Sequence, residues 1–241
     1  MSRHKQKRFS ETKLMENIME PGKAPYLEMA GRWGPDFFQN EAPVVLELAC
    51  GKGEYTYGLS KAFPEKNFIG MDIKGSRMYI GAKACEREDL KNAAFLRGKI
   101  QNLRTFFGWR EVSEIWITFP DPRPRNKDEK RRLTFSRFLQ LYQHVLKEEG
   151  IVHLKTDSRP LMDFTVESVE AFGGNILALT HDLYNSIYKS VHFGIKTHYE
   201  TLFSEKGFSI NYCRFKLPVL PEPLGPPDPI YTDNGDLKIF P

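Results

Sequence analysis

The sequence has 241 residues, of which 40% are hydrophobic and 27% are charged, as is typical of a globular protein with one large domain or two small ones. The formal net charge is only +4. No run approaches the roughly 18 apolar residues of a membrane span, and the basic N-terminus lacks the apolar core of a secretory signal. Three widely spaced cysteines, Cys50, Cys85 and Cys213, argue against a disulfide framework and a zinc site. We therefore expect a cytoplasmic protein without a metal.

Positive charge is concentrated in two segments. Residues 1–13 contain five basic residues and one acidic residue, and residues 121–132 contain six basic and three acidic residues. Two basic segments on a nearly neutral chain favour a localised binding site for a polyanion, although a solvated loop and a disordered tail would give the same pattern. Residues 1–43 also contain four prolines and three glycines. They predict a basic, largely irregular N-terminal arm with one short helix near residues 12–19.

Strands and helices alternate along residues 44–217. Short apolar runs predict strands at 44–50, 67–73, 93–98, 114–118, 151–155, 175–179 and 210–217. Amphipathic segments predict helices at 54–62, 76–89, 135–149, 161–172 and 201–206. Ser76 is expected to cap the second helix and Gly150 to stop the third. The pattern predicts one α/β domain, a mostly parallel seven-stranded sheet with helices on both faces, and a proline-rich tail at residues 218–241.

A glycine turn follows the first strand. Gly51 and Gly53 form a G-x-G turn between strand and helix, as in nucleotide-binding α/β units, but Thr56 occupies the third glycine position of the dinucleotide fingerprint. This departure disfavours a nicotinamide oxidoreductase. Glu47 lies inside an apolar strand and needs a donor partner. Asp72 ends the second strand 19 residues after Gly53, a spacing that suits a carboxylate that binds two ribose hydroxyls.

The most informative stretch is Phe119–Arg125, with the sequence FPDPRPR, which directly follows the strand 114–118. Its prolines end that strand, because proline lacks the N–H that a sheet ladder needs, and two of them flank Asp121. Ligands of parallel sheets bind beyond the carboxyl ends of the strands. We therefore expect one shared site, next to the basic segment, formed by Gly51, Gly53, Asp72, Asp121 and Asp157.

These motifs resemble, in the same order, those of the bacterial tRNA (guanine-N7)-methyltransferases that act on position 46 of the variable loop. The resemblance covers about residues 44–217. Glu47–Gly53 is similar to the family's E-x-G-x-G-K-G loop for S-adenosylmethionine. Phe119–Arg125 and Lys130–Arg132 are similar to its F-P-D-P-W-P-K…K-R-R signature, Lys155–Asp157 to its K-T-D segment, and Thr197–Glu200 to its T-x-Y-E segment.

The resemblance implies a Rossmann-like class I methyltransferase fold, S-adenosylmethionine as the cofactor and tRNA as the substrate. It places the cofactor at Glu47, Gly51, Gly53 and Asp72, and it places Asp121 at the catalytic centre. It implies substrate contacts at Arg125, Asp157, Thr197, His198, Tyr199 and Glu200. The sequence leaves the oligomeric state open.

Three residues depart from the family pattern. Ala49 replaces the usual first glycine, Arg123 replaces a tryptophan, and Lys99 replaces an acid that contacts the cofactor near its adenine. Gln101 or a backbone group could supply that adenine contact instead. Two alternatives stay open, the second of them because of Ala49 and Lys99. One is a Rossmann-type methyltransferase for another RNA or a small molecule, and the other is a non-catalytic RNA-binding relative.

Two of the candidate site residues also have structural interpretations. Glu47 could be a carboxylate that supports its own glycine turn. Either Asp157 or Ser158 could cap the helix that follows, whose first turn accommodates Pro160.

Overall fold

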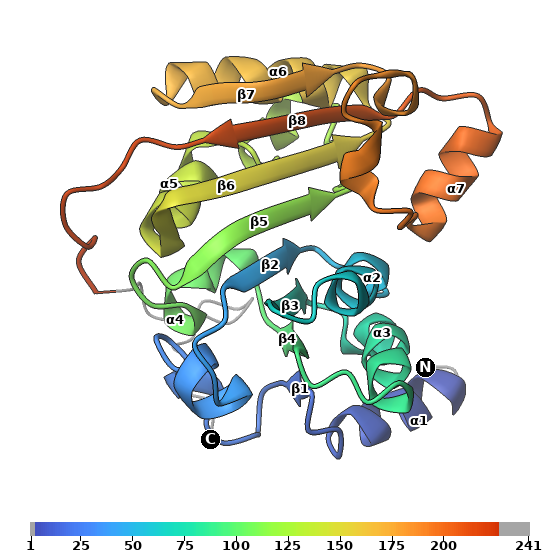
Figure 1. Ribbon diagram of the computed structural model, residues 1–241, viewed down its shortest axis with the longest axis vertical. Helices are drawn as coiled ribbons and strands as arrows, with labels where there is room; N and C mark the ends of the chain where they lie inside the picture. Colours follow the sequence, from blue (N-terminus) through green and yellow to red (C-terminus); the bar gives the residue numbers. More distant parts are fainter. Residues whose placement is uncertain (1–2, 227–241) are drawn as a thin grey trace.

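Eight strands form one sheet in the computed structural model, which describes residues 3–226 (Figure 1). They are β1 (Ile18–Met19), β2 (Val44–Leu48), β3 (Asn67–Asp72), β4 (Ala93–Arg97), β5 (Val112–Thr118), β6 (Leu146–Thr156), β7 (Asn175–Thr180) and β8 (Asn211–Lys216). Their order in the sheet is β1-β4-β3-β2-β5-β6-β8-β7. β8 runs antiparallel to β6 and β7, and the other neighbouring strands are parallel. The predicted α/β fold is confirmed, with β1 as one strand more than the seven expected.

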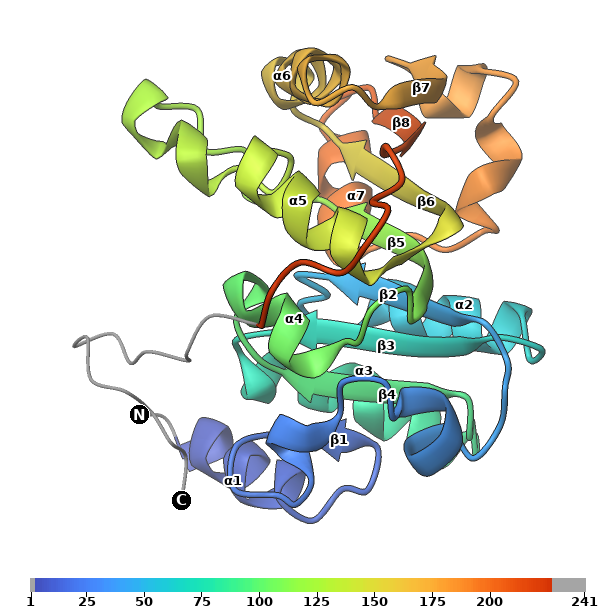
Figure 2. The ribbon, with the colours of Figure 1, turned by 90° about the vertical axis from the view of Figure 1, so that its left-hand side faces the viewer.

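Helices cover both faces of the sheet (Figure 2). The α-helices are α1 (Arg3–Thr12), α2 (Glu54–Ala62), α3 (Gly75–Arg87), α4 (Leu103–Phe106), α5 (Ser136–Val145), α6 (Arg159–Ala171) and α7 (His198–Glu205). Short helical segments are η1 (Tyr26–Glu28), η2 (Trp33–Phe38), η3 (Ile100–Asn102), η4 (Asn126–Arg131), η5 (Leu183–Asn185) and η6 (Lys189–His192). Apolar residues of α4, α5 and α6 pack on one face, and those of α2 and α3 pack on the other.

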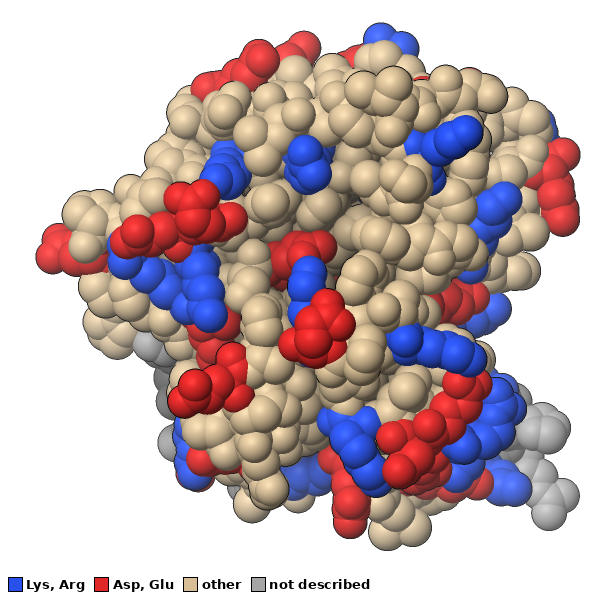
Figure 3. All heavy atoms as spheres, viewed as in Figure 1, with Lys and Arg blue, Asp and Glu red and all other residues tan. Residues whose placement is uncertain are grey.

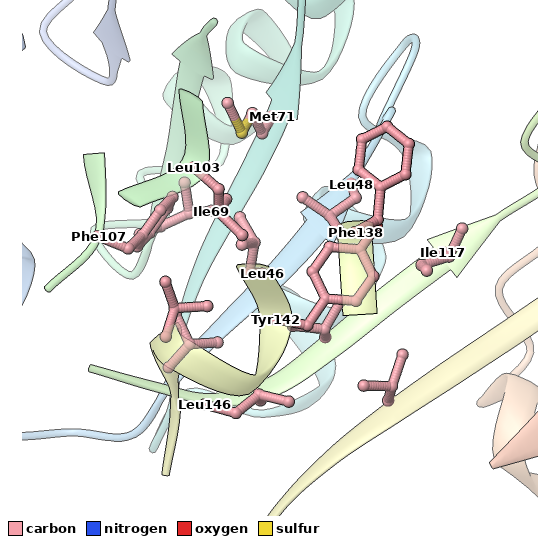
Figure 4. Packing of buried hydrophobic residues seen from close by; sticks show 14 of the residues in the cluster. Leu46, Leu48, Ile69, Met71, Leu103, Phe107, Ile117, Phe138, Tyr142 and Leu146 are labelled. Atoms are coloured by element: carbon pink, nitrogen blue, oxygen red, sulfur yellow. The ribbon is translucent and has the colours of Figure 1, made fainter. Parts of the chain in front are cut away.

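β2 lies near the centre of the sheet, and all five of its residues are buried, as a continuous apolar run predicts for a strand covered on both faces. Figure 4 shows Leu46 and Leu48 of β2 near Ile69 and Met71 of β3, in the same cluster as Phe138 of α5. The parallel register pairs Leu46 with Ile69 and Leu48 with Met71. This register brings the carboxyl ends of β2 and β3, and the loops that follow them, to the same edge.

The N-terminal segment is more ordered than the sequence predicted. Its helix is α1 rather than a helix near residues 12–19, and β1 extends the sheet by pairing with β4. The Nζ of Lys23 donates to the carbonyl oxygens of Thr12, Met15 and Ile18 at 3.0, 2.6 and 2.6 Å. The indole of Trp33 is fully buried and donates to the carbonyl of Phe106 at 2.7 Å. The prediction of a largely irregular arm is wrong because these contacts, both the local ones of Lys23 and the long-range one of Trp33, leave no periodic pattern in the sequence.

Two predicted helix ends are also wrong. α5 ends at Val145 rather than at Gly150, because Leu146 adopts an extended conformation and pairs with Val112. Gly150 therefore lies inside β6. Ser76 does not cap α3: Lys74 is the N-cap residue, and its backbone N–H donates to Asp72 Oδ1 at 2.8 Å.

The described part of the proline-rich tail crosses α5 and reaches α4 (Figure 2). Gln143 donates to the carbonyl of Pro218 at 2.6 Å, and Arg110 donates to that of Leu220 at 3.0 Å. Residues 227–241 lie outside the described residues. Within residues 3–226, no helix is long and apolar enough to cross a membrane.

Candidate active site

A cleft of about 930 Å³ lies at the carboxyl edge of the sheet, lined by the loops that follow β2 to β6 and by the first part of α7. Seven of the predicted site residues line it: Gly51, Asp72, Asp121, Asp157, Thr197, His198 and Tyr199. Four do not: Glu47, Gly53, Arg125 and Glu200. Within the described chain, no group of three or more His, Cys, Asp or Glu residues could hold a metal ion.

The backbone of the glycine turn adopts a left-handed conformation at three positions. Ala49, Gly51 and Gly53 have φ angles of 58°, 57° and 73°, in the left-handed region that glycine adopts most readily. A Cβ on Gly53 would lie 2.3 Å from the ring of Phe95, so this position also lacks space for a side chain. Ala49, at the position of the first glycine of the family motif, also adopts the left-handed backbone.

Glu47 links the helix that follows this turn to the end of β5. Its side chain is 3% exposed, and its Oε2 accepts hydrogen bonds from the backbone N–H and hydroxyl of Thr56 at 2.8 and 2.6 Å. Its Oε1 accepts a bond from the hydroxyl of Thr118 at 2.8 Å. Burial raises the pKa of Glu47 to about 7, although all these hydrogen bonds oppose the shift. Cofactor contact by Glu47 stays a prediction, and its contacts favour the structural interpretation.

Asp72 links the ends of β2 and β3. Its Oδ2 accepts from the N–H of Gly51 at 3.0 Å, and its Oδ1 accepts from the N–H of Lys74. Each carboxylate oxygen keeps further lone-pair capacity for a ligand hydroxyl. The neighbouring Ile73 is 57% exposed and lines the cleft, and it adds an apolar surface beside the carboxylate.

The proline loop presents Asp121 at the mouth of the cleft. Phe119 and Arg123 have φ angles of 50° and 47°, so a left-handed residue lies on each side of the carboxylate. The Asp121 side chain is 61% exposed and forms a 3.2 Å ion pair with the Nε of Arg123. Its Oδ1 also accepts from the backbone N–H of Arg123 at 3.2 Å. Arg123 thus contacts the carboxylate directly, from a position where the family has tryptophan.

The basic segment after the proline loop contains two kinds of arginine. Arg125 and Arg131 both pair with Asp128, at 2.6 and 3.2 Å, and their own side chains are 65% and 64% exposed. Arg132 is only 12% exposed, donates to the carbonyl of Arg123 at 3.2 Å and lies 4.4 Å from the ring centroid of Phe164. Arg132 therefore holds the loop in place, and among the basic residues of this segment it is poorly exposed for contact with a phosphate.

The K-T-D segment contributes Asp157 to the cleft. Ser158 rather than Asp157 caps α6, because its hydroxyl accepts from the N–H of Leu161 at 3.3 Å. Burial raises the pKa of Asp157 above its ordinary value. Since the cap is provided by Ser158, the Asp157 carboxylate remains available to a ligand.

The T-x-Y-E segment forms the start of α7. Thr197 caps the helix in a reciprocal capping box with Glu200. Tyr199 is 45% exposed and lines the cleft. Glu200, by contrast, is fully buried and forms a 2.6 Å ion pair with Lys155, which is also fully buried. The predicted substrate contact at Glu200 does not fit this position, because no part of its side chain reaches the surface.

Sequence reasoning missed several residues of the site. Thr118 lines the cleft and holds Glu47, and Arg137 contributes a guanidinium group from the first turn of α5. Lys155 had a detectable signal: a charged residue in an otherwise apolar predicted strand requires a buried partner. Thr118 gave no such signal, because threonine is common in strands.

Comparisons with known proteins agree with this geometry. Residues 41–213 match a family model described as "Putative methyltransferase". The tRNA (guanine-N(7)-)-methyltransferase of Christiangramia forsetii is 46% identical over 221 residues, which cover 90% of this chain and 99% of that protein. The protein with the same name from Porphyromonas gingivalis is 49% identical over 214 residues, which cover 88% and 84%.

The chain belongs to the tRNA (guanine-N7)-methyltransferase family. Among solved structures, the 16S rRNA methyltransferase KamB superposes with a TM-score of 0.57 at 16% identity and covers 73% of this chain and 88% of that chain. An antibiotic-resistance methyltransferase, Kmr, gives a TM-score of 0.52 at 15% identity and covers 74% and 88%. These likenesses confirm the methyltransferase fold of this family member.

The cleft has the features that S-adenosylmethionine, the cofactor of this family, needs. Asp72 could accept hydrogen bonds from ribose hydroxyls, and Ile73 and Ile100 could provide apolar surface for an adenine ring. Of the two residues considered for a contact near the adenine, Lys99 does not line the cleft but Gln101 does. The residues therefore fit the cofactor, and Gln101 is placed to provide a polar contact in this part of the cleft.

Proposed function

We propose that this protein transfers a methyl group from S-adenosylmethionine to N7 of guanine 46 in the variable loop of tRNA. One observation carries the proposal: the exposed carboxylate of Asp121 lines the same cleft as Gly51 and Asp72. A carboxylate suited to a guanine edge and one suited to a ribose thus face a common space. The family relationship supports guanine N7 as the target atom, and position 46 is the finer part of the proposal.

The reaction needs orientation more than proton transfer. S-adenosylmethionine, when bound, supplies a methyl group on a positively charged sulfur, and guanine N7 has an in-plane lone pair that needs no deprotonation before attack. The protein therefore has to hold the reacting atoms in line and stabilise the charge that moves to the purine. The carboxylates that line the cleft are the groups suited to stabilise this charge.

Asp121 is the residue that we assign to orientation. Its carboxylate can accept hydrogen bonds from N1–H and N2–H₂ of guanine, which leaves N7 directed into the cleft. Methylation makes N1–H more acidic, so this hydrogen bond strengthens as the transition state forms. Asp121 then acts as an orienting and stabilising group rather than as a base.

The nucleobase can replace Arg123 as the partner of the Asp121 carboxylate. Both side chains are partly exposed, at 61% and 38%, and exposed ion pairs contribute only roughly 0–1 kcal/mol. A guanine that enters the cleft can therefore replace Arg123 on the carboxylate at little cost. The released guanidinium would lie beside the RNA and is free to pair with a phosphate.

The remaining contacts to RNA are local. We propose that Asp157, Thr197, His198 and Tyr199 contact the nucleotide from the side of α6 and α7, and that Arg125 contacts the backbone outside the cleft. Figure 3 shows acidic and basic side chains interspersed on one face, without a broad basic surface. Limited phosphate contacts near the cleft are consistent with the small net charge of +4.

The test compares Asp121→Asn with Asp163→Asn in single-turnover methylation of a tRNA transcript. Asp163 is a matched control, because its carboxylate is 50% exposed and paired with Arg159 on the surface of α6. We expect a loss of at least about 100-fold for Asp121→Asn, as for removal of a group that stabilises developing charge, and near-normal rates for Asp163→Asn. Near-normal methylation by Asp121→Asn would contradict the assigned role.

The target nucleotide is tested with the wild-type protein. Labelled S-adenosylmethionine is offered with a tRNA transcript, with the same transcript carrying adenosine at position 46, and with 16S rRNA. Chain cleavage at N7-methylated guanines then locates the product. We expect label only in the first RNA, whereas methylation of the adenosine variant or of rRNA alone would reject guanine 46 as the target.

A further inference from the structure

The buried ion pair between Lys155 and Glu200 joins four elements of the fold. Lys155 lies near the end of β6, and its Nζ donates to Glu200 Oε1 at 2.6 Å and to the hydroxyl of Tyr55 in α2 at 2.8 Å. The hydroxyl of Tyr184 in η5 donates to the same Oε1 at 2.6 Å. Both charged side chains are 0% exposed. The pair therefore connects four elements: Glu200 Oε1 links α7 to the sheet and to η5, and the Lys155 ammonium links the sheet to α2.

The second oxygen of Glu200 is also occupied within the protein. Glu200 Oε2 accepts from the backbone N–H of Thr197 at 3.4 Å, and the hydroxyl of Thr197 accepts from the N–H of Glu200 at 3.0 Å. Full burial and internal partners at both oxygens leave no acceptor of Glu200 for RNA. Its position instead fixes Thr197, His198 and Tyr199, which form the cleft-facing start of α7.

The pair lies between the two walls of the cleft. In β6, Lys155 is aligned with Thr118 of β5 and lies two residues before Asp157, and both of these residues line the cleft. On the other wall, α7 has a second attachment, from the N–H of His198 to Glu54 Oε1 at 3.1 Å, which is exposed. The buried pair is therefore the attachment that sets the distance between Asp157 and the start of α7.

Stability alone does not explain such a pair. The cost of removing two charges from water often exceeds their attraction, so a well-packed apolar pair of similar volume would be as stable or more so. An ion pair whose side chains also bond to Tyr55, Tyr184 and Thr197 does provide a defined geometry, because a shift of α7 would leave a buried charge without its partner.

We infer that Lys155 and Glu200 are positioning residues, which fix the substrate-facing end of α7 against β6, and that Glu200 does not contact the RNA. The inference rests on the proposed function, because it concerns how the tRNA side of the cleft is held. It differs from the role that the T-x-Y-E resemblance implies for Glu200. It also makes Lys155 part of substrate recognition although it is fully buried.

The test uses Glu200→Gln, Lys155→Met and the double variant. Glu200→Gln leaves a buried ammonium without its counter-charge and Lys155→Met leaves a buried carboxylate without its counter-charge, so we expect each to raise the dissociation constant for tRNA by at least about tenfold. The double variant removes both charges, and we expect it to recover most of this loss, since residues in one buried network are strongly non-additive. The affinity for S-adenosylhomocysteine, measured by calorimetry, should change less than about twofold, because the Asp72 carboxylate is bonded to Gly51 and Lys74 and not to the pair.

A second pair of variants keeps the inference testable if the charged-pair variants unfold. Tyr184→Phe removes one hydrogen bond to Glu200 and should raise the dissociation constant for tRNA a few-fold with little change in melting temperature. Tyr199→Ala removes a residue that lines the cleft, and its effect should add to that of Lys155→Met rather than be rescued.

Two results would overturn the inference. Additive effects of Glu200→Gln and Lys155→Met on tRNA binding would mean that Glu200 meets the RNA independently of Lys155. An equal loss of tRNA and S-adenosylhomocysteine affinity in Tyr184→Phe would mean that the network supports the fold as a whole. Wild-type protein that binds but does not methylate tRNA would contradict the proposed function, whereas the coupling in tRNA binding would still decide the role of the pair.

Discussion

Glu47→Gln tests whether burial raises the pKa of this carboxylate, because the two side chains differ in charge but hardly in shape. The amide oxygen can accept the two hydrogen bonds from Thr56 in place of Oε2. The amide nitrogen can then donate to Thr118, whose hydroxyl can reverse its role from donor to acceptor. The variant should therefore keep the glycine turn, and its stability should differ from that of the wild type mainly through the ionisation of Glu47.

The magnitude follows from the raised pKa. Burial shifts the pKa of Glu47 from 4.5 to about 7 in the folded protein, so the folded state holds this proton more tightly than the unfolded state. The resulting stabilisation is fully present below pH 4.5 and is lost as the pH rises through about 7. The shift corresponds to about 3 kcal/mol of unfolding free energy. Glu47→Gln lacks this dependence, so its stability relative to the wild type should increase by that amount between about pH 4.5 and pH 8.

Denaturant unfolding of both proteins at pH 5, 6, 7 and 8 measures this difference. Glu41→Gln, at an exposed position, is the control for the loss of a carboxylate as such. A wild-type-to-Gln difference that stays constant across this range would refute the reasoning. It would mean that Glu47 is ionised throughout and that its three hydroxyl and amide donors outweigh its burial.

Two further predictions concern the glycine turn and the basic segment. Gly53→Ala should lower the unfolding free energy by about 2–4 kcal/mol and weaken S-adenosylhomocysteine binding, because its Cβ would lie 2.3 Å from Phe95 at a left-handed backbone position; unchanged calorimetric affinity and melting temperature would contradict this. Lys127→Gln, at an exposed residue, should reduce the slope of log K for tRNA against log salt by about 1 if Lys127 contacts a phosphate. Arg132→Gln should leave that slope unchanged and lower the melting temperature instead. A reduced slope for Arg132→Gln together with an unchanged slope for Lys127→Gln would contradict the separate roles given to these two residues.

The central strands and their loops were predictable because local sequence determines them. A mostly apolar run such as Val44–Leu48 is typical of a parallel strand that is buried on both faces. The G-x-G turn after it needs the left-handed backbone found at Gly51 and Gly53. The rule that ligands bind beyond the carboxyl ends of strands then placed Asp72, Asp121 and Asp157 at one cleft.

The N-terminal segment was not predictable in the same way. Lys23 joins three carbonyl groups of residues 12–18, and two-residue β1 pairs with a strand more than 70 positions away. Neither contact changes the local periodicity of the sequence. The end of α5 was missed for a related reason: a strand pairing at Leu146, rather than a glycine, stops the helix.

The assignment of Glu200 illustrates how a family motif and the physical pattern of the same residues can lead to different roles. Thr197 and Glu200 have the Thr-x-x-Glu spacing of a capping box, which turns the glutamate side chain back toward the start of its own helix. In this orientation it meets Lys155, the charged residue of an apolar strand that needs a partner. His198 and Tyr199, between the two box residues, are left facing the cleft. The motif therefore combines two residues that set the position of α7 with two that can meet the substrate, and the spacing alone distinguishes them.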